Sequence, residues 1–171
     1  MDKRQQISNG ARRAAFCGLF VALALVLSWI EFIFPLQIPL PGVKLGLANL
    51  VTVFALYKLK PADTVAISLA RIVLAGLLFG GLFSMLYALC GGILSLVVMM
   101  LLKKTGRLAV VTVSICGGVA HNLGQLAFAF AAMNSEVVAA YLPALLAGGI
   151  VSGAVIGALG GILAAKVDVR R

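Results

Sequence analysis

The chain has 171 residues, of which 63% are hydrophobic and 11% are charged. Soluble domains carry charge on roughly a quarter of their residues, so this composition excludes a soluble globular protein. One membrane-spanning helix takes about 20 apolar residues, which leaves room for about six spans and their loops. We therefore predict a single all-α integral membrane domain over residues 1–171.

Apolar runs predict six transmembrane helices in a bundle. Their approximate ranges are 14–34, 44–57, 62–81, 84–102, 108–133 and 137–166. The second is short, and Gly80 and Gly81 predict a tight join between the third and the fourth. An even number of spans places both termini on the same side of the membrane.

The distribution of the 14 Lys and Arg residues predicts which side that is. Twelve of these residues lie in the N-terminal segment, the turns 58–60 and 103–107, and the C-terminal segment. The alternate loops hold none. Because cytoplasmic loops carry the excess of Lys and Arg, we predict that both termini face the cytoplasm. Short basic runs form no continuous basic face, so the net charge of +9 does not indicate a nucleic-acid partner.

Polar residues recur at mid-membrane depth in three predicted helices. Arg71 lies about ten residues into the third helix, roughly 15 Å deep at 1.5 Å per residue. Asn49 lies at a similar level in the second helix, and His121, Asn122 and Gln125 lie halfway along the fifth. A cation at this depth should face the protein interior and find a partner. These five residues are either structural hydrogen bonders or, as their shared depth suggests, the binding site of a small polar or anionic solute.

The segment between the first two predicted helices contains three prolines, which cannot continue a helix. We predict an extended outer loop, which either gates the pocket or simply connects the helices. Charged residues flank it and are either part of the gate or ordinary interfacial charges. The residues assigned to the gate and outer loop are Glu31, Pro39, Pro41, Gly42 and Lys44.

Small residues spaced four apart allow helix backbones to approach closely in lipid. The last predicted helix has this spacing at Gly149, Gly153, Gly157 and Gly161. These glycines serve either packing within the chain or contact with another subunit. The first helix has a weaker pattern, for which packing and partner docking are both open, at Ala11, Ala15, Gly18 and Ala22.

Catalytic motifs are missing from the sequence. The five acidic residues are scattered, so no carboxylate pair can hold magnesium or perform paired acid and base chemistry. Nucleotide-binding motifs and clustered Cys or His ligands are also missing. We predict no enzymatic activity, no cofactor and no metal site. Active transport would then need a partner subunit or an ion gradient.

Three stretches together resemble a known bacterial family. They are the run from Pro41 to Asn49, the run from Tyr87 to Gly92 with Arg71, and the run from His121 to Gln125. The chain resembles the family labelled Gx transporter, or heptaprenyl diphosphate synthase component I, over nearly its whole length. That family is similar to the substrate-binding S components of energy-coupling factor transporters.

The resemblance implies a multi-pass protein of the bacterial cytoplasmic membrane that joins a transmembrane coupling subunit with ATPases. In S components, small residues of the first helix contact the coupling subunit, a role that falls here on Ala11 and Ala15, and the first outer loop gates the solute. The leading hypothesis is therefore a solute-binding subunit for uptake. The alternative is a noncatalytic membrane accessory subunit of prenyl diphosphate or quinone biosynthesis, or of a quinone-linked electron-transfer system. A purely structural assembly subunit is a third possibility.

Overall fold

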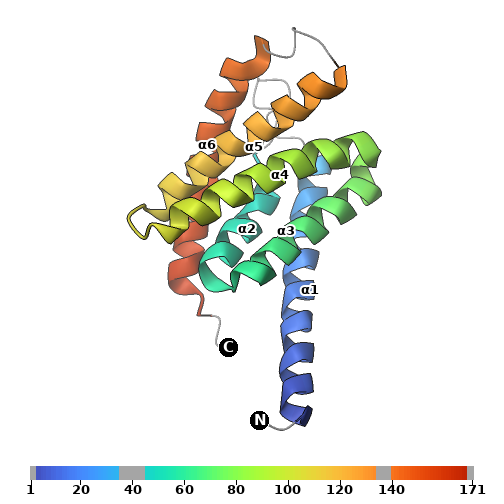
Figure 1. Cartoon of the computed structure of the whole chain (residues 1–171), viewed down its shortest axis with the longest axis vertical. Coiled ribbons are helices and arrows are strands. Elements are labelled where there is room, and N and C mark those ends of the chain that lie inside the picture. Colours follow the sequence, from blue (N-terminus) through green and yellow to red (C-terminus); the bar gives the residue numbers. More distant parts are fainter. Residues whose placement is uncertain (1–2, 35–44, 134–139, 169–171) are drawn as a thin grey trace.

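The computed structural model describes residues 3–34, 45–133 and 140–168. Within these ranges the chain is helical and has no strand, so the all-α prediction is confirmed. Figure 1 shows the arrangement of its elements. They are α1 (Lys3–Ile33), α2 (Leu47–Lys58), α3 (Pro61–Ala75), the π-helical segment η1 (Gly76–Gly80), α4 (Gly81–Lys104), α5 (Val110–Met133) and α6 (Leu142–Lys166).

The helix bounds follow the predicted ranges closely, with a clear difference in α1. This helix begins at Lys3 and not near residue 14, because the Lys, Arg and Gln residues before the apolar run are good helix formers. Its N-terminal turns project beyond the other helices (Figure 1). At the other end of the chain, α6 begins at Leu142 with a proline in its first turn. Residues 137–139, where it was predicted to start, lie outside the described residues.

Gly81 reverses the chain between η1 and α4. Its φ angle of +74° lies in the region that favours glycine, as a tight join at this position requires. The helical segments on either side of Gly81, α3 with η1 and α4, pack side by side (Figure 1). A Cβ atom on Gly76 would collide with Cβ of Met85 across this hairpin, so glycine is needed there for close approach. The predicted join at Gly80 and Gly81 is thus confirmed.

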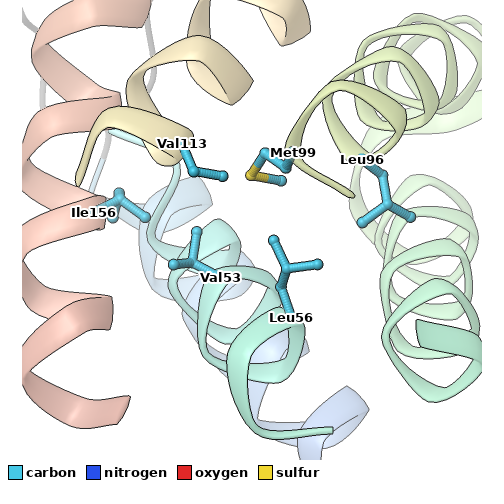
Figure 2. Packing of buried hydrophobic residues seen from close by; sticks show 6 residues of the cluster. All are labelled: Val53, Leu56, Leu96, Met99, Val113 and Ile156. Carbon is cyan, nitrogen blue, oxygen red and sulfur yellow. The ribbon is translucent and has the colours of Figure 1, made fainter. Parts of the chain in front are cut away.

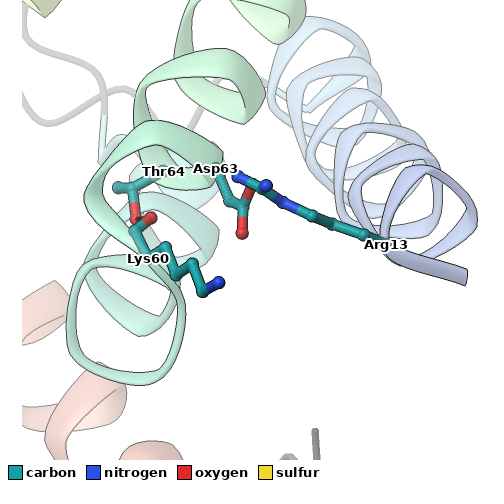
Figure 3. A network of polar contacts seen from close by, with 4 residues as sticks. All are labelled: Arg13, Lys60, Asp63 and Thr64. Carbon is teal, nitrogen blue, oxygen red and sulfur yellow. Dashed lines mark hydrogen bonds and ion pairs between the residues drawn. The ribbon is translucent and has the colours of Figure 1, made fainter. Parts of the chain in front are cut away.

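Contacts near the ends of α1, α2 and α3 show that these helices alternate in direction. The end of α1 meets the start of α2, where the Gly46 amide donates a 2.5 Å hydrogen bond to Oε1 of Glu31. The start of α1 meets the start of α3, where Arg13 and Asp63 form a 2.5 Å ion pair (Figure 3). The chain therefore runs along α1, returns along α2 and runs out again along α3.

Four stretches are long and apolar enough to cross a membrane: Gly10–Ile33, Pro61–Lys104, Val110–Met133 and Leu142–Lys166. α2 is shorter, with 12 residues and a length of about 18 Å at 1.5 Å per residue. Large apolar side chains point outward from these stretches; Leu19, Leu77 and Leu101 are 66%, 67% and 62% exposed. An apolar surface of this extent suits lipid and not water.

The centre of the bundle is built around α2, whose residues from Val51 to Leu56 are all buried. Figure 2 shows its side chains meeting those of α4, α5 and α6. This cluster contains Val53, Leu56, Leu96, Met99, Val113 and Ile156. A second cluster packs α2 against α1 and α3 through Ala24, Val51, Ala55 and Ile67. Because α2 is held on both sides, residues at its ends are fixed relative to every other helix.

The glycines of α6 bring its backbone against α5. A Cβ atom on Gly153 would lie 2.7 Å from Cα of Ile115, and one on Gly157 would lie 2.8 Å from Cα of Val111. A Cβ atom on Gly149 would lie 2.9 Å from the carbonyl oxygen of Gly118. Since α6 residues of rising number meet α5 residues of falling number, the two helices are antiparallel. Gly149, Gly153 and Gly157 therefore serve packing within the chain.

Candidate functional site

A cavity of about 450 Å³ lies inside the bundle and is lined by residues from all six α-helices. It lies between the end of α1, the start of α2, the end of α3 with η1, the start of α4, and the middle of α5, with one residue from α6. Its polar lining is Ser28, Glu31, Asn49, Arg71, Ser84, Tyr87, His121, Asn122, Gln125 and Ser152. All five residues that the sequence assigned to a solute site thus reach one cavity.

Arg71 enters this cavity from α3 and is hydrogen-bonded to Asn49 of α2, with Nη2 donating to the amide Oδ1. Its Nε is buried and has no hydrogen-bond partner among the described residues. A guanidinium offers five N–H donors, and one neutral amide satisfies only part of them. The arrangement leaves a cation at the cavity wall whose binding capacity is incompletely used.

His121 and Gln125 line the cavity from the same face of α5, one helical turn apart. Their position depends on a close approach of α4. A Cβ atom on Gly91 would lie 2.7 Å from Cγ of Gln125 and 3.1 Å from Nε2 of His121. Within the described part of the chain, neither side chain makes a hydrogen bond to the protein, so the imidazole and the amide can serve a ligand.

Asn122 has a structural bond as well as a place in the cavity lining. Its Nδ2 donates a 2.6 Å hydrogen bond to the carbonyl oxygen of Leu145, in the first turns of α6. This bond ties α5 to α6 at the level of the cavity. Asn122 therefore combines the structural and the binding interpretation.

Glu31 brings a negative charge into the cavity lining next to the start of α2. Its carboxylate accepts the amide N–H of Gly46, which adopts a left-handed conformation with φ of 76° just before the helix. A carboxylate at a helix N-terminus is favoured by the helix dipole. At the other end of α2, Lys103 Nζ donates a 2.5 Å bond to the carbonyl oxygen of Leu56. A negative residue thus binds the N-terminal end of this short central helix and a positive residue binds its C-terminal end, as the helix dipole favours.

The π-helical segment η1 forms one wall of the cavity through Gly76, Phe79 and Gly80. π-Helical turns are rare and occur frequently at functional sites, where they alter the direction of nearby side chains. Here Phe79 stacks on Phe32 of α1, with ring centroids 5.9 Å apart. This aromatic pair joins α1 to the hairpin of η1 and α4 beside the polar lining.

The small residues of α1 lie on the outside of the molecule. Ala11, Ala15, Gly18 and Ala22 are all exposed. No other atom lies within 4 Å of a Cβ position on Gly18. In contrast, Gly161 of α6 faces Val110, where a Cβ atom would be in ordinary contact at 3.6 Å. The small-residue patterns of α1 and α6 therefore occupy opposite environments, one on the outside of the molecule and one between helices.

Several cavity residues were missed in the sequence. Ser28, Ser84 and Ser152 are hydroxyls on otherwise apolar helices, and Phe32, Phe79 and Tyr87 supply aromatic surface. The spacing offers a signal in hindsight, because Ser28 is three residues before Glu31 and Ser84 is three before Tyr87, which places each pair on one helical face. Of the predicted gate residues, Glu31 lines the cavity, whereas Pro39, Pro41, Gly42 and Lys44 lie outside the described residues.

Together, the apolar helices and the internal polar cavity define a multi-pass helical membrane protein. Comparisons with curated proteins and with solved structures give no match. The sequence model of the family described as heptaprenyl diphosphate synthase component I matches residues 20–163. The chain therefore belongs to the heptaprenyl diphosphate synthase component I family, and it has the properties of a membrane component subunit.

Proposed function

We propose that this chain is a solute-binding membrane subunit, similar to the S components of energy-coupling factor transporters. It takes up a small polar or anionic solute and is energised by partner subunits. The observation that carries the proposal is Arg71, a partly bonded guanidinium in a cavity lined by all six helices. His121 and Gln125 add a titratable ring and an amide within the same lining.

The proposal includes six membrane crossings, with both termini in the cytoplasm of a bacterial cell. The alternating directions of α1, α2 and α3 and the antiparallel pair of α5 and α6 support six crossings. The cytoplasmic orientation rests on the twelve Lys and Arg residues in the terminal segments and in the turns 58–60 and 103–107, on the side of the membrane opposite to the loops that hold none. Labelling of a single cysteine from either side, in a chain whose three native cysteines are replaced, tests it. Ala109→Cys, in the exposed turn between α4 and α5, should react from the cytoplasmic side, and reaction from the outer side would overturn the orientation.

The family description favours a second candidate, a noncatalytic membrane accessory subunit of prenyl diphosphate or quinone biosynthesis, or of a quinone-linked electron-transfer system. The charges of the cavity weigh against a diphosphate ligand. Among the described lining residues, Arg71 carries one fixed positive charge and Glu31 carries a negative one. A diphosphate would normally be held by several cations or by magnesium on paired carboxylates. We therefore propose solute binding first, and propose that the chain itself is not an enzyme.

Partner docking falls on the exposed small-residue face of α1, formed by Ala11, Ala15, Gly18 and Ala22. Such a face allows the backbone of a second membrane helix to approach closely. In our proposal it receives the transmembrane coupling subunit. Because the sequence contains no nucleotide-binding motif, our proposal assigns ATP hydrolysis to that partner complex.

Native mass spectrometry of gently extracted protein tests the proposed function. We expect a small polar or anionic molecule to co-purify with the wild type and to be lost from Arg71→Ala. Arg107→Ala is the matched control, because it removes an exposed guanidinium from the turn between α4 and α5. Equal retention of the molecule in Arg71→Ala would remove Arg71 from the site. A bound polyprenyl diphosphate or quinone, or co-purification with a soluble synthase, would support the second candidate.

A further inference from the structure

The cavity holds two opposite charges that do not neutralise each other by direct contact. Glu31 and Arg71 both line it, yet the ion pair found within the described residues is that of Arg13 and Asp63. Glu31 is bonded to the amide of Gly46, and Arg71 is bonded to the side chain of Asn49. Each charge is thus held by a neutral partner on α2 and keeps further bonding capacity.

The bonds that hold Glu31 and Arg71 are both made at the start of α2. Gly46 and Asn49 are three residues apart, and the amide of Asn49 bonds back to the carbonyl oxygen of Gly46 at 2.7 Å. The negative and the positive group are therefore both held at the start of α2 and line the same cavity, so one compact ligand can contact both.

The rest of the cavity bears on the character of such a ligand. A volume of about 450 Å³ lies in the range typical of sites for small organic molecules. Phe79 and Tyr87 provide aromatic walls, and Gln125 provides an amide. These surfaces can receive an uncharged side chain beyond the charged end of the ligand.

We infer that the solute is a compact zwitterion of the amino-acid type, with its carboxylate at Arg71 and its ammonium group at Glu31. This inference rests on the proposed solute-binding function and specifies its substrate class. Burying a single charge in an apolar protein is costly. In a zwitterion bound between Arg71 and Glu31, each ligand charge is compensated by a protein group of opposite charge. A simple anion would leave Glu31 as an unfavourable neighbour.

The first test uses the unmodified chain in detergent and a panel of matched probes. The panel contains the standard α-amino acids, each with the carboxylate that lacks its amino group and the amine that lacks its carboxyl group. A ligand that binds the folded state raises the melting temperature according to its concentration and affinity. We expect at least one amino acid to raise it, with both of its single-charge analogues at least 10-fold weaker. If carboxylates bind as tightly as amino acids, or no amino acid binds, the inference is wrong.

The second test is Glu31→Gln, which keeps a hydrogen-bond acceptor for Gly46 and removes only the charge. Loss of one charge-assisted bond should weaken amino-acid binding by roughly 10- to 100-fold, whereas the matching carboxylate should bind at least as tightly as before, because a like charge is removed from its surroundings. Unchanged amino-acid affinity would overturn the role of Glu31. If this variant fails to fold, the comparison of probes on the unmodified chain still decides the matter.

The two proposals fail in different ways. A co-purifying simple anion that depends on Arg71 but not on Glu31 would overturn the zwitterion and leave the solute-binding function intact. Failure of the solute-binding function itself would appear as a wild-type protein that carries no small molecule other than lipid.

Discussion

Arg71 of α3 donates a hydrogen bond from Nη2 to Oδ1 of Asn49, at the start of the buried helix α2. The bond joins two residues that are 22 positions apart in the chain. It holds the guanidinium at the cavity wall without neutralising its charge, because the partner is an amide and not a carboxylate. The pair therefore carries a net positive charge, which a substitution of Asn49 can change.

Replacing the amide by a carboxylate should separate stability from binding. Asn49→Asp places a negative charge against Arg71, and a paired cation inside the bundle is more favourable than an incompletely compensated one. We expect a melting temperature equal to or above that of the wild type, with affinity for the solute reduced by roughly 10- to 100-fold because the new carboxylate competes for the guanidinium. Thermal unfolding and a binding titration on the same sample measure both quantities. Unchanged affinity would mean that the solute does not contact Arg71.

Two glycines of α6 should respond differently to alanine. In Gly153→Ala the new methyl group would meet backbone atoms of Ile115 and Ser114 at less than 3 Å, whereas in Gly161→Ala it would meet Val110 at 3.6 Å. Overpacking against backbone costs about 1–3 kcal/mol, so Gly153→Ala should be destabilised by that amount. Gly161→Ala is the matched control and should be neutral or slightly stabilised. Thermal unfolding in detergent provides the measurement, and equal melting temperatures would contradict the close contact of α5 and α6.

Leucine substitutions on the exposed and on the buried side of α1 should distinguish residues that dock a partner from residues that pack within the chain. Gly18→Leu adds a side chain where no atom lies within 4 Å, so the isolated chain should stay folded and keep its solute. Ala24→Leu adds the same bulk at a residue that is 1% exposed, and should destabilise the fold by about 1–3 kcal/mol.

For Gly18→Leu we also expect loss of the coupling subunit during co-purification, because the added bulk separates the two helices. A complex that survives this substitution unchanged would move the docking surface away from this face of α1.

Neighbouring lysines at the end of α4 should differ in their effect on α2. Lys103 bonds to the carbonyl oxygen of Leu56, whereas Lys104 is exposed in the same turn. Hydrogen bonds from charged groups contribute about 1.5–3 kcal/mol, so Lys103→Met should lower the free energy of unfolding by about that much and Lys104→Met by much less. Both variants remove one positive charge from the same loop, so their effect on membrane orientation is matched. Equal stabilities would show that Lys103 does not support α2.

The sequence alone determined the class of the protein, the number and position of its helices, and the residues that merit attention. Its apolar fraction requires a bilayer, because water would not tolerate so much exposed hydrocarbon. That Arg71, His121 and Gln125 lie at matching levels of their helices was predicted by counting residues, since the helical rise is constant, and all three line one cavity. The reversal at Gly81 followed from the two adjacent glycines.

Only the tertiary structure decided which faces meet. In a membrane helix the lipid-facing and the inward-facing sides are both apolar, so periodicity alone does not distinguish them. For this reason the sequence left the glycines of α6 and the small residues of α1 with the same two interpretations. The structure places Gly153 between helices and Gly18 on the outside.

The same reason explains why the bonds of Glu31 and Lys103 could not be foreseen. Their partners are the Gly46 amide and the Leu56 carbonyl. Every residue has a backbone carbonyl and every residue except proline has a backbone N–H, so these partners leave no mark on the sequence. The sequence predicted both charged residues at the membrane surface, whereas in the structure they bond to the two ends of α2. Three-dimensional packing also brought Asn49, Arg71 and His121 to one cavity, because separate helices at equal depth share a site only when their polar sides face each other.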